Sequence, residues 1–98
     1  MDKPFNDVVR ELKKEEAELL LLKHSAYGPK NIANAPGGPL NGLAVRLHDK
    51  LARLAHLIEK GHDPEWESLE DTFLDIAGYG SIGTLVLRNE WPADSDED

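Results

Sequence analysis

Acidic side chains recur at four-residue spacing in an otherwise apolar segment, residues 67–87, whose sequence is ESLEDTFLDIAGYGSIGTLVL. Glu67, Asp71 and Asp75 therefore share one side of a helix, because an α-helix completes a turn roughly every 3.6 residues. A further acid, Glu16, falls inside the apolar stripe of an earlier segment. A charge on an inner helix face is costly unless it is paired or bound to a metal, so these acids are candidates for chemistry.

Carboxylates from facing helices are the groups with which helical bundles hold divalent cations. Oxygen ligands in a chain without cysteine favour Mg²⁺ or Mn²⁺. Magnesium takes substrate phosphates as further ligands, which predicts metal-assisted hydrolysis of a phosphoanhydride with Glu16 and Asp71 as catalytic residues. The alternative is structural. Glu16 would then pair with a base on a neighbouring helix, and Asp71 would form a capping box with Ser68 at a helix start.

Basic and polar side chains that could contact a phosphate lie in two further segments. The loop 26–39, AYGPKNIANAPGGP, is long for a connection between helices, and such loops are often functional. The next helix carries bases away from its apolar stripe, which indicates either a ridge that meets phosphates or a solvated face with ordinary salt bridges. The candidate ligand-binding residues are Lys23, Tyr27, Lys30, Asn31, Arg46, Lys50 and Arg53. For Lys23 the alternative is a side chain that snorkels at a helix end, and for the asparagine a turn-forming role.

Apolar periodicity predicts three main helices, at about 4–25, 39–60 and 68–89. The first has a stripe formed by Phe5, Val8, Val9, Leu12, Leu19 and Leu20. The third is apolar nearly all round and rich in glycine, which predicts close approach by another helix. We therefore expect an all-α fold: a small bundle of three main helices with a long Gly/Pro loop after the first, completed by oligomerisation. Residues 1–91 form the predicted helical domain, and 92–98 a disordered acidic tail.

Composition and charge exclude several classes of function. The formal net charge of −8 makes binding to a DNA backbone unfavourable, although a nucleotide can still bind if a divalent cation neutralises both partners. The longest apolar run, at 19–22, is too short to span a membrane, and the first residues lack the apolar region of a signal peptide. We expect a cytoplasmic protein without membrane association.

Three blocks, YGPKNI, RLHDKLARLAHLI and ESLEDTFLDIAGYGSIG, occur in this order between Tyr27 and Leu87. Together they resemble the phage and bacterial family called nucleotide modification associated domain, which is itself similar to the MazG-like all-α nucleotide pyrophosphohydrolases. The MazG-like pattern has paired glutamates on an early helix and Glu-x-x-Asp on a later one, together holding magnesium. The resemblance implies a homo-oligomer and a metal site formed by Glu15, Glu16, Glu67, Asp71 and Asp75. The later acids depart from that pattern, because they recur every four residues instead of every three.

Three functions stay open, in the following order. The first is a magnesium-dependent nucleotide pyrophosphohydrolase. The second is a non-catalytic binder that sequesters a nucleotide or a nucleotide second messenger, as an anti-defence sponge would. The third is a helical interaction module whose acids only form ion pairs. The first two share one expected partner, a nucleotide or nucleotide-derived small molecule.

Overall fold

The computed structural model describes residues 2–60 and 66–92, without the side chains of residues 66 and 67. The described residues form helices and connecting turns and include no strand, which confirms the all-α class. The helices are α1 (Phe5–Tyr27), α2 (Lys30–Ala33), α3 (Pro39–Lys60) and α4 (Trp66–Leu87). The predicted acidic tail and the turn before α4 lie outside the described residues. No described helix is long and apolar enough to cross a membrane.

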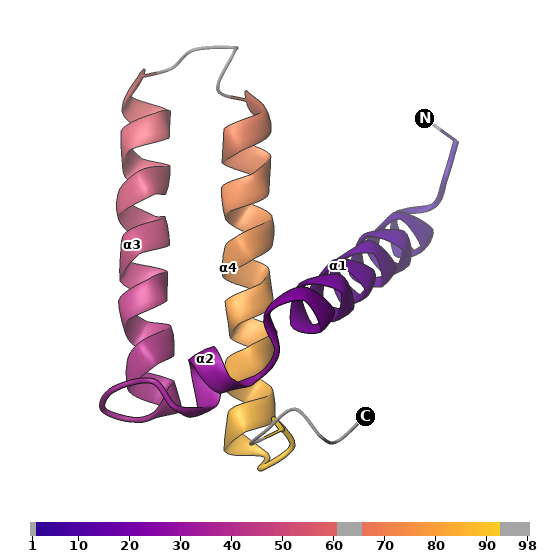
Figure 1. Ribbon diagram of the computed structural model, residues 1–98. Helices are drawn as coiled ribbons and strands as arrows, with labels where there is room; N and C mark the ends of the chain where they lie inside the picture. The colour runs from indigo at the N-terminus through magenta and orange to yellow at the C-terminus, as the bar shows by residue number, and fades with distance from the viewer. Residues whose placement is uncertain (1, 61–65, 93–98) are drawn as a thin grey trace.

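Helices α3 and α4 lie side by side and run in opposite directions (Figure 1). Their contact buries Leu43 and Leu57 of α3 and Ile82 of α4. Gly83 of α4 faces Leu43, whose Cδ1 lies 3.8 Å from the position that a Cβ on Gly83 would occupy. This antiparallel pair is the scaffold on which the other elements are placed.

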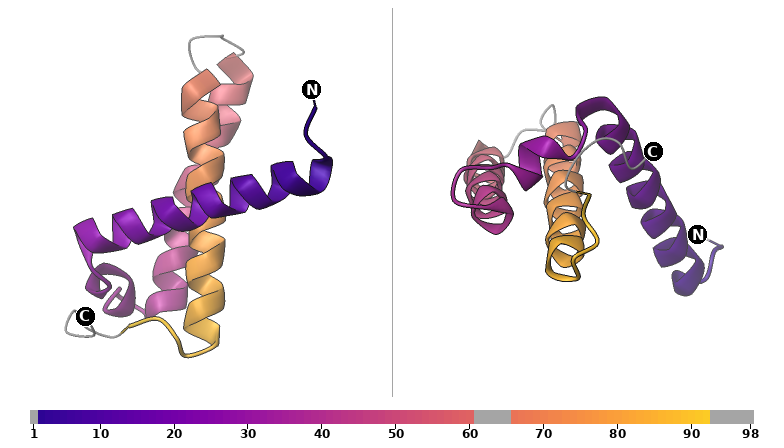
Figure 2. Two further views of the ribbon diagram at one scale, coloured as in Figure 1. Left: turned by 90° about the vertical axis from the view of Figure 1, so that its right-hand side faces the viewer. Right: turned by 60° about the horizontal axis from the view of Figure 1, so that its bottom comes forward.

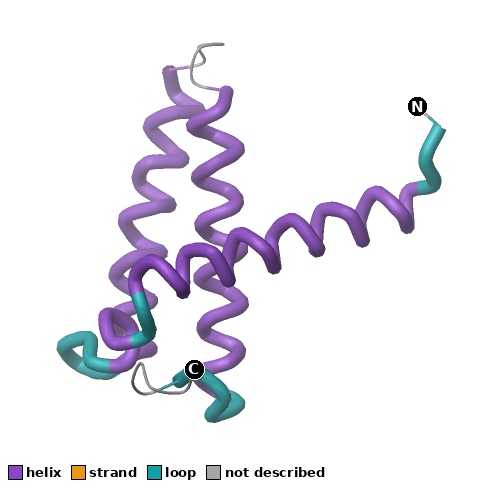
Figure 3. Tube along the Cα trace, turned by 45° about the vertical axis from the view of Figure 1, so that its right-hand side comes forward, coloured by secondary structure: helices purple, strands orange, loops and turns teal. Residues whose placement is uncertain are grey.

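Helix α1 crosses α4 obliquely, and its first half extends away from the α3–α4 pair (Figures 2 and 3). Its second half packs against the core through Leu20. The predicted apolar stripe is therefore buried only in part: Phe5 is 77% exposed and Leu12 is 42% exposed. The first part of the stripe lies outside the core of the described chain, because α1 projects past the end of its contact with α4.

The segment expected to be a long loop contains the short helix α2. Ile32 of α2 is buried and belongs to the same cluster as Leu43 and Ile82. The chain turns from α1 into α2 at Gly28, where φ is 74° and ψ is 176°, a region that is accessible almost only to glycine. Pro29 follows and is fully buried. Gly28 and Pro29 thus turn the chain so that α2 packs against the core.

Both ends of α4 differ from the sequence-based expectation. The helix begins at Trp66, so Ser68 lies inside it and does not cap it; the Ser68 carbonyl instead accepts a hydrogen bond of 2.6 Å from the buried Thr72 hydroxyl. At the other end, Asn89 adopts φ 60°, and the N–H of Glu90 donates to the Leu85 carbonyl at 2.8 Å. This Schellman arrangement reverses the chain after α4.

The glycines of α4 differ in what surrounds them. A Cβ on Gly83 would make only ordinary van der Waals contact with Leu43 of α3, and a Cβ on Gly78 or Gly80 would meet no atom within 4 Å. Close approach of another helix therefore requires none of these three glycines within the described chain. Gly78 instead lines a cavity, where the absence of a side chain leaves space.

Candidate functional site

A cavity of about 340 Å³ lies where the second half of α1, helix α2, α3, α4 and the segment after α4 meet. Five of the seven predicted ligand-binding residues line it: Lys23, Tyr27, Asn31, Arg46 and Lys50. One predicted metal ligand, Asp75, lines it too. The structure thus brings together residues that lie up to 52 positions apart in the sequence.

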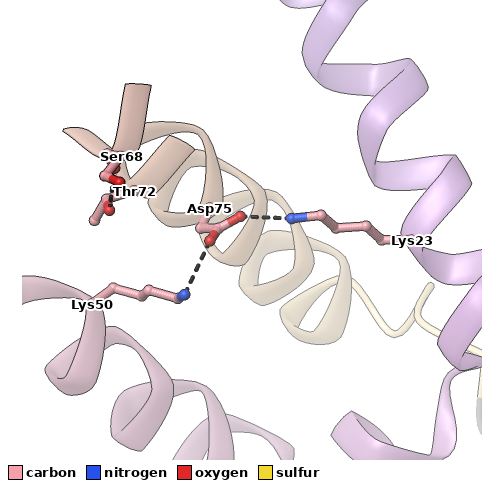
Figure 4. A network of polar contacts seen from close by, with 5 residues as sticks. All are labelled: Lys23, Lys50, Ser68, Thr72 and Asp75. Atoms are coloured by element: carbon pink, nitrogen blue, oxygen red, sulfur yellow. Dashed lines mark hydrogen bonds and ion pairs between the residues drawn. The ribbon is translucent and has the colours of Figure 1, made fainter. Parts of the chain in front are cut away.

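Asp75 is the centre of the charged side of this cavity (Figure 4). Its Oδ1 accepts a hydrogen bond of 2.6 Å from Lys23 Nζ of α1, and its Oδ2 forms an ion pair of 3.0 Å with Lys50 Nζ of α3. One carboxylate on α4 therefore connects three helices. The two lysines come from opposite sides, so each carboxylate oxygen has its own ammonium partner.

These contacts shift the ionisation of both partners. Partial burial raises the pKa of Asp75, but hydrogen bonds from Lys23 and Lys50, together with their positive charges, outweigh it and bring the pKa below 3.8. The hydrogen bond to Asp75 raises the pKa of Lys23 above 10.5, although partial burial acts in the opposite direction. Both groups are therefore charged at neutral pH.

Arg46 supplies a third positive charge to the cavity. Its guanidinium makes long hydrogen bonds to the Asn31 backbone carbonyl, 3.5 Å from Nη1 and 3.4 Å from Nη2. Long contacts of this kind are weak, so the guanidinium can turn to a stronger acceptor at small cost. A carboxylate or phosphate would be such an acceptor, because it matches the planar fork of arginine.

Aromatic side chains also line the cavity. Trp91, which follows the reversed end of α4, donates from Nε1 to the Pro29 carbonyl at 3.3 Å. The Trp91 ring packs edge-to-face on His24 with centroids 5.2 Å apart. Tyr79 and Tyr27 also line the cavity. Aromatic faces beside cationic groups suit a ligand that combines a planar ring with a negative charge.

The remaining predicted ligand-binding residues lie elsewhere. Lys30 and Arg53 are exposed and do not line the cavity. His24, Tyr79 and Trp91 line the cavity but were not predicted from the sequence. The helical spacing of Tyr79, one turn after Asp75, is the one sequence signal that could have indicated any of them.

The predicted metal ligands are dispersed in this chain. Glu15 and Asp71 are exposed, and Glu16 pairs with Lys13 of its own helix at 3.2 Å instead of with a base on a neighbouring helix. The side chain of Glu67 lies outside the described residues. Within the part of the chain that the structure describes, no three His, Asp or Glu side chains are grouped as metal ligands would be. Within the described residues these carboxylates are not gathered into a Mg²⁺ or Mn²⁺ site, and Asp75 already has two ammonium partners.

Comparisons of this chain with models of protein families, with curated proteins and with solved structures find no match. The resemblance to the nucleotide modification associated domain family therefore stays a prediction.

Proposed function

We propose that this protein binds a phosphorylated small molecule of the nucleotide class in the cavity around Asp75, and that it binds without a metal ion. One observation carries the proposal. Lys23 and Lys50 both pair with one carboxylate in a cavity that Arg46 and several aromatic side chains also line. The excess of two positive charges complements a phosphate group, which carries about −1.5 to −2 charges at neutral pH.

Asp75 supports anion binding even though it is itself an anion. It holds the two lysines in fixed positions and keeps Lys23 charged. Both ammonium groups stay partly exposed, with 44% of the Lys23 side chain and 30% of the Lys50 side chain accessible. A phosphate can therefore bind to their free donors without displacing Asp75, since an ammonium group has three donors.

The aromatic side chains that line the cavity favour a ligand with a nucleic-acid base over a phosphate ion alone. Stacking of a nucleic-acid base on an aromatic side chain is worth about 1–3 kcal/mol. Trp91 is fixed by its hydrogen bond to the Pro29 carbonyl, so its ring is oriented before any ligand arrives. The cavity volume of about 340 Å³ is at the lower end of small-molecule sites, roughly 300–1,000 Å³, which favours a single nucleotide unit.

The test is thermal melting of the protein with a panel of mononucleotides and cyclic dinucleotides, with and without magnesium. A ligand at a hundred times its dissociation constant adds about 2.7 kcal/mol of stability, which is readily measured. We expect a shift with at least one nucleotide in the presence of EDTA. No shift with any nucleotide would contradict the proposal.

Two variants of α3 locate the site. Lys50→Gln removes an ammonium group that lines the cavity, whereas Arg53→Gln removes the same charge from an exposed position outside it. A lost charge-assisted contact to phosphate costs about 1.5–3 kcal/mol, so Lys50→Gln is expected to weaken binding roughly 10- to 100-fold. Arg53→Gln is expected to change it little. Equal effects of the two variants would place the ligand elsewhere.

Turnover is measured on every nucleotide that binds. Release of pyrophosphate or phosphate that requires magnesium, and that Asp71→Asn or Glu16→Gln abolishes, would support the predicted hydrolase. Binding without product supports sequestration. We place sequestration first, because the acids needed for a metal site are dispersed in the described chain.

A further inference from the structure

The first half of α1 presents an apolar face that no described part of this chain covers. Residues 5–11, the arm, extend away from the α3–α4 pair (Figure 3). Phe5, Val8 and Val9 lie on one side of the arm and are 77%, 38% and 36% exposed. Contiguous apolar surface of this kind marks an interaction site.

A groove lies directly beside the arm. Its cavity of about 330 Å³ is lined by Leu12, Glu16, Leu69, Glu70, Phe73 and Leu74, and Phe73 is 56% exposed. The lining comes from α1 and from the first half of α4. The arm and the groove are therefore neighbours on one surface of one molecule. A two-fold symmetric contact requires this arrangement, because each copy must offer both surfaces to the other.

The chain as a whole exposes more surface than a compact monomer of its mass. A folded monomer of 10.9 kDa is expected to expose about 5,600 Å², from the scaling of surface with mass. This chain exposes 7,266 Å². The excess of about 1,700 Å² is twice the roughly 800 Å² that each partner contributes to a standard interface.

The charges on α1 favour a protein partner over a membrane surface. Helices that lie on membranes carry mainly lysine and arginine on their polar side. Here bases and acids alternate and pair with each other: Lys3 with Glu11 at 2.7 Å and Lys13 with Glu16 at 3.2 Å. The charges on the polar side are thus locally neutralised. Burial of the apolar side provides the driving force for association with a protein partner.

We propose that two copies of this chain exchange their arms, so that Phe5, Val8 and Val9 of each copy pack into the groove of the other. Each arm then covers Leu12 and Phe73 of the second copy. The inference is independent of the ligand proposal, because the arm and the groove share no residue with the cavity around Asp75 except Leu74.

The experiment is sedimentation equilibrium of the full chain without nucleotide. We expect the mass of two chains for the wild type. Val8→Glu places a charge on the arm and Phe73→Glu places one in the groove; each is expected to raise the dimer dissociation constant at least 100-fold. Leu21→Glu is the matched control, since Leu21 is on the opposite side of α1 and 66% exposed.

Circular dichroism shows whether each variant is still folded, which separates a loss of pairing from a loss of structure. All three variants change exposed residues, so each should retain the helical spectrum of the wild type. A monomeric wild type at concentrations in the 100 µM range would overturn the proposal, including the case in which that monomer binds lipid vesicles or another protein. An assembly that Val8→Glu and Phe73→Glu leave intact, or that Leu21→Glu breaks equally, would overturn it too.

Discussion

Asp75 joins three helices through two ion pairs. Its two oxygens face lysines from α1 and α3, so it connects the helix that projects from the bundle to the helix pair beneath it. Ion pairs this exposed are individually weak, because water screens them. Their effect here is mainly geometric: they determine where Lys23 and Lys50 present their free donors.

Asp75→Asn is expected to lower the free energy of unfolding by about 1 kcal/mol at pH 7 and low salt, and by less at high salt. Folding lowers the pKa of Asp75 below 3.8, so its stabilisation is present above that value and is lost as pH falls through the folded pKa. Folding raises the pKa of Lys23 above 10.5, so its share is present below 10.5 and is lost at higher pH. Urea denaturation across this pH range measures both limits.

The control for Asp75→Asn is Asp71→Asn, which removes the same charge one turn earlier on α4. Asp71 is exposed and no ion pair to it is found among the described residues. We expect a change in stability close to zero at every pH. The interpretation fails if both variants lose equal stability, or if the loss in Asp75→Asn persists when the carboxylate is protonated.

At the scale of the elements, Gly28 is the point where α1 ends and the chain turns under the core. Its φ of 74° and ψ of 176° suit glycine, and a Cβ there would meet no atom within 4 Å. Gly28→Ala therefore tests backbone strain without steric collision. We expect a loss of about 2 kcal/mol in the free energy of unfolding, measured by urea denaturation.

Gly80 provides the opposite case within a helix. It is exposed in α4, and a Cβ there would also meet no atom within 4 Å. Gly80→Ala is expected to stabilise the protein by about 0.5–1 kcal/mol, because alanine restricts the unfolded chain and favours helix. If Gly80→Ala destabilised the protein, another surface would have to pack against this face of α4.

Helical periodicity predicted the three long helices because each repeats its apolar residues at nearly every turn. The same reasoning missed α2, since a helix of four residues is too short to show a period. The same reasoning placed the start of α4 two residues too late and its end two residues too late. Capping patterns near Ser68 and Asn89 are compatible with several helix bounds, and tertiary contacts decide among them.

The candidate site was predictable only in part for a related reason. Lys23 could be singled out because its charge interrupts an apolar stripe. Lys50 could be singled out as one of the bases that lie away from the apolar stripe of α3. Whether Lys50 or Arg53 faces the cavity depends on how α1 crosses the α3–α4 pair, which no local pattern encodes. Trp91 reaches the cavity through the chain reversal at Asn89 and contacts Pro29, 62 residues earlier.

At the scale of the whole molecule, the chain is expanded for its length. The radius of gyration is 15.4 Å, whereas about 12.6 Å is expected for a globular chain of 98 residues. The buried core is small, with Ile32, Leu43, Leu57 and Ile82 as its buried apolar residues within the described chain. A core of this size gives limited stability by itself, so covering the arm and the groove would add much of the total.

The melting temperature should therefore depend on protein concentration. If folding and pairing are coupled, a tenfold increase in concentration adds about 1.4 kcal/mol per dimer. For two chains of this length that corresponds to a rise of about 3 °C in melting temperature. Circular dichroism melts over about a hundredfold range of concentration would show a rise of roughly 6 °C for the wild type.

The variants separate pairing from general stability. Val8→Glu should melt at a temperature independent of concentration, and lower than that of the wild type at the highest concentration, because its arm no longer pairs. Leu21→Glu should keep the full concentration dependence, since its side chain lies outside the contact. A wild-type melting temperature that stays constant over this range would mean that the small core suffices alone, and that the extended arm is stable in water.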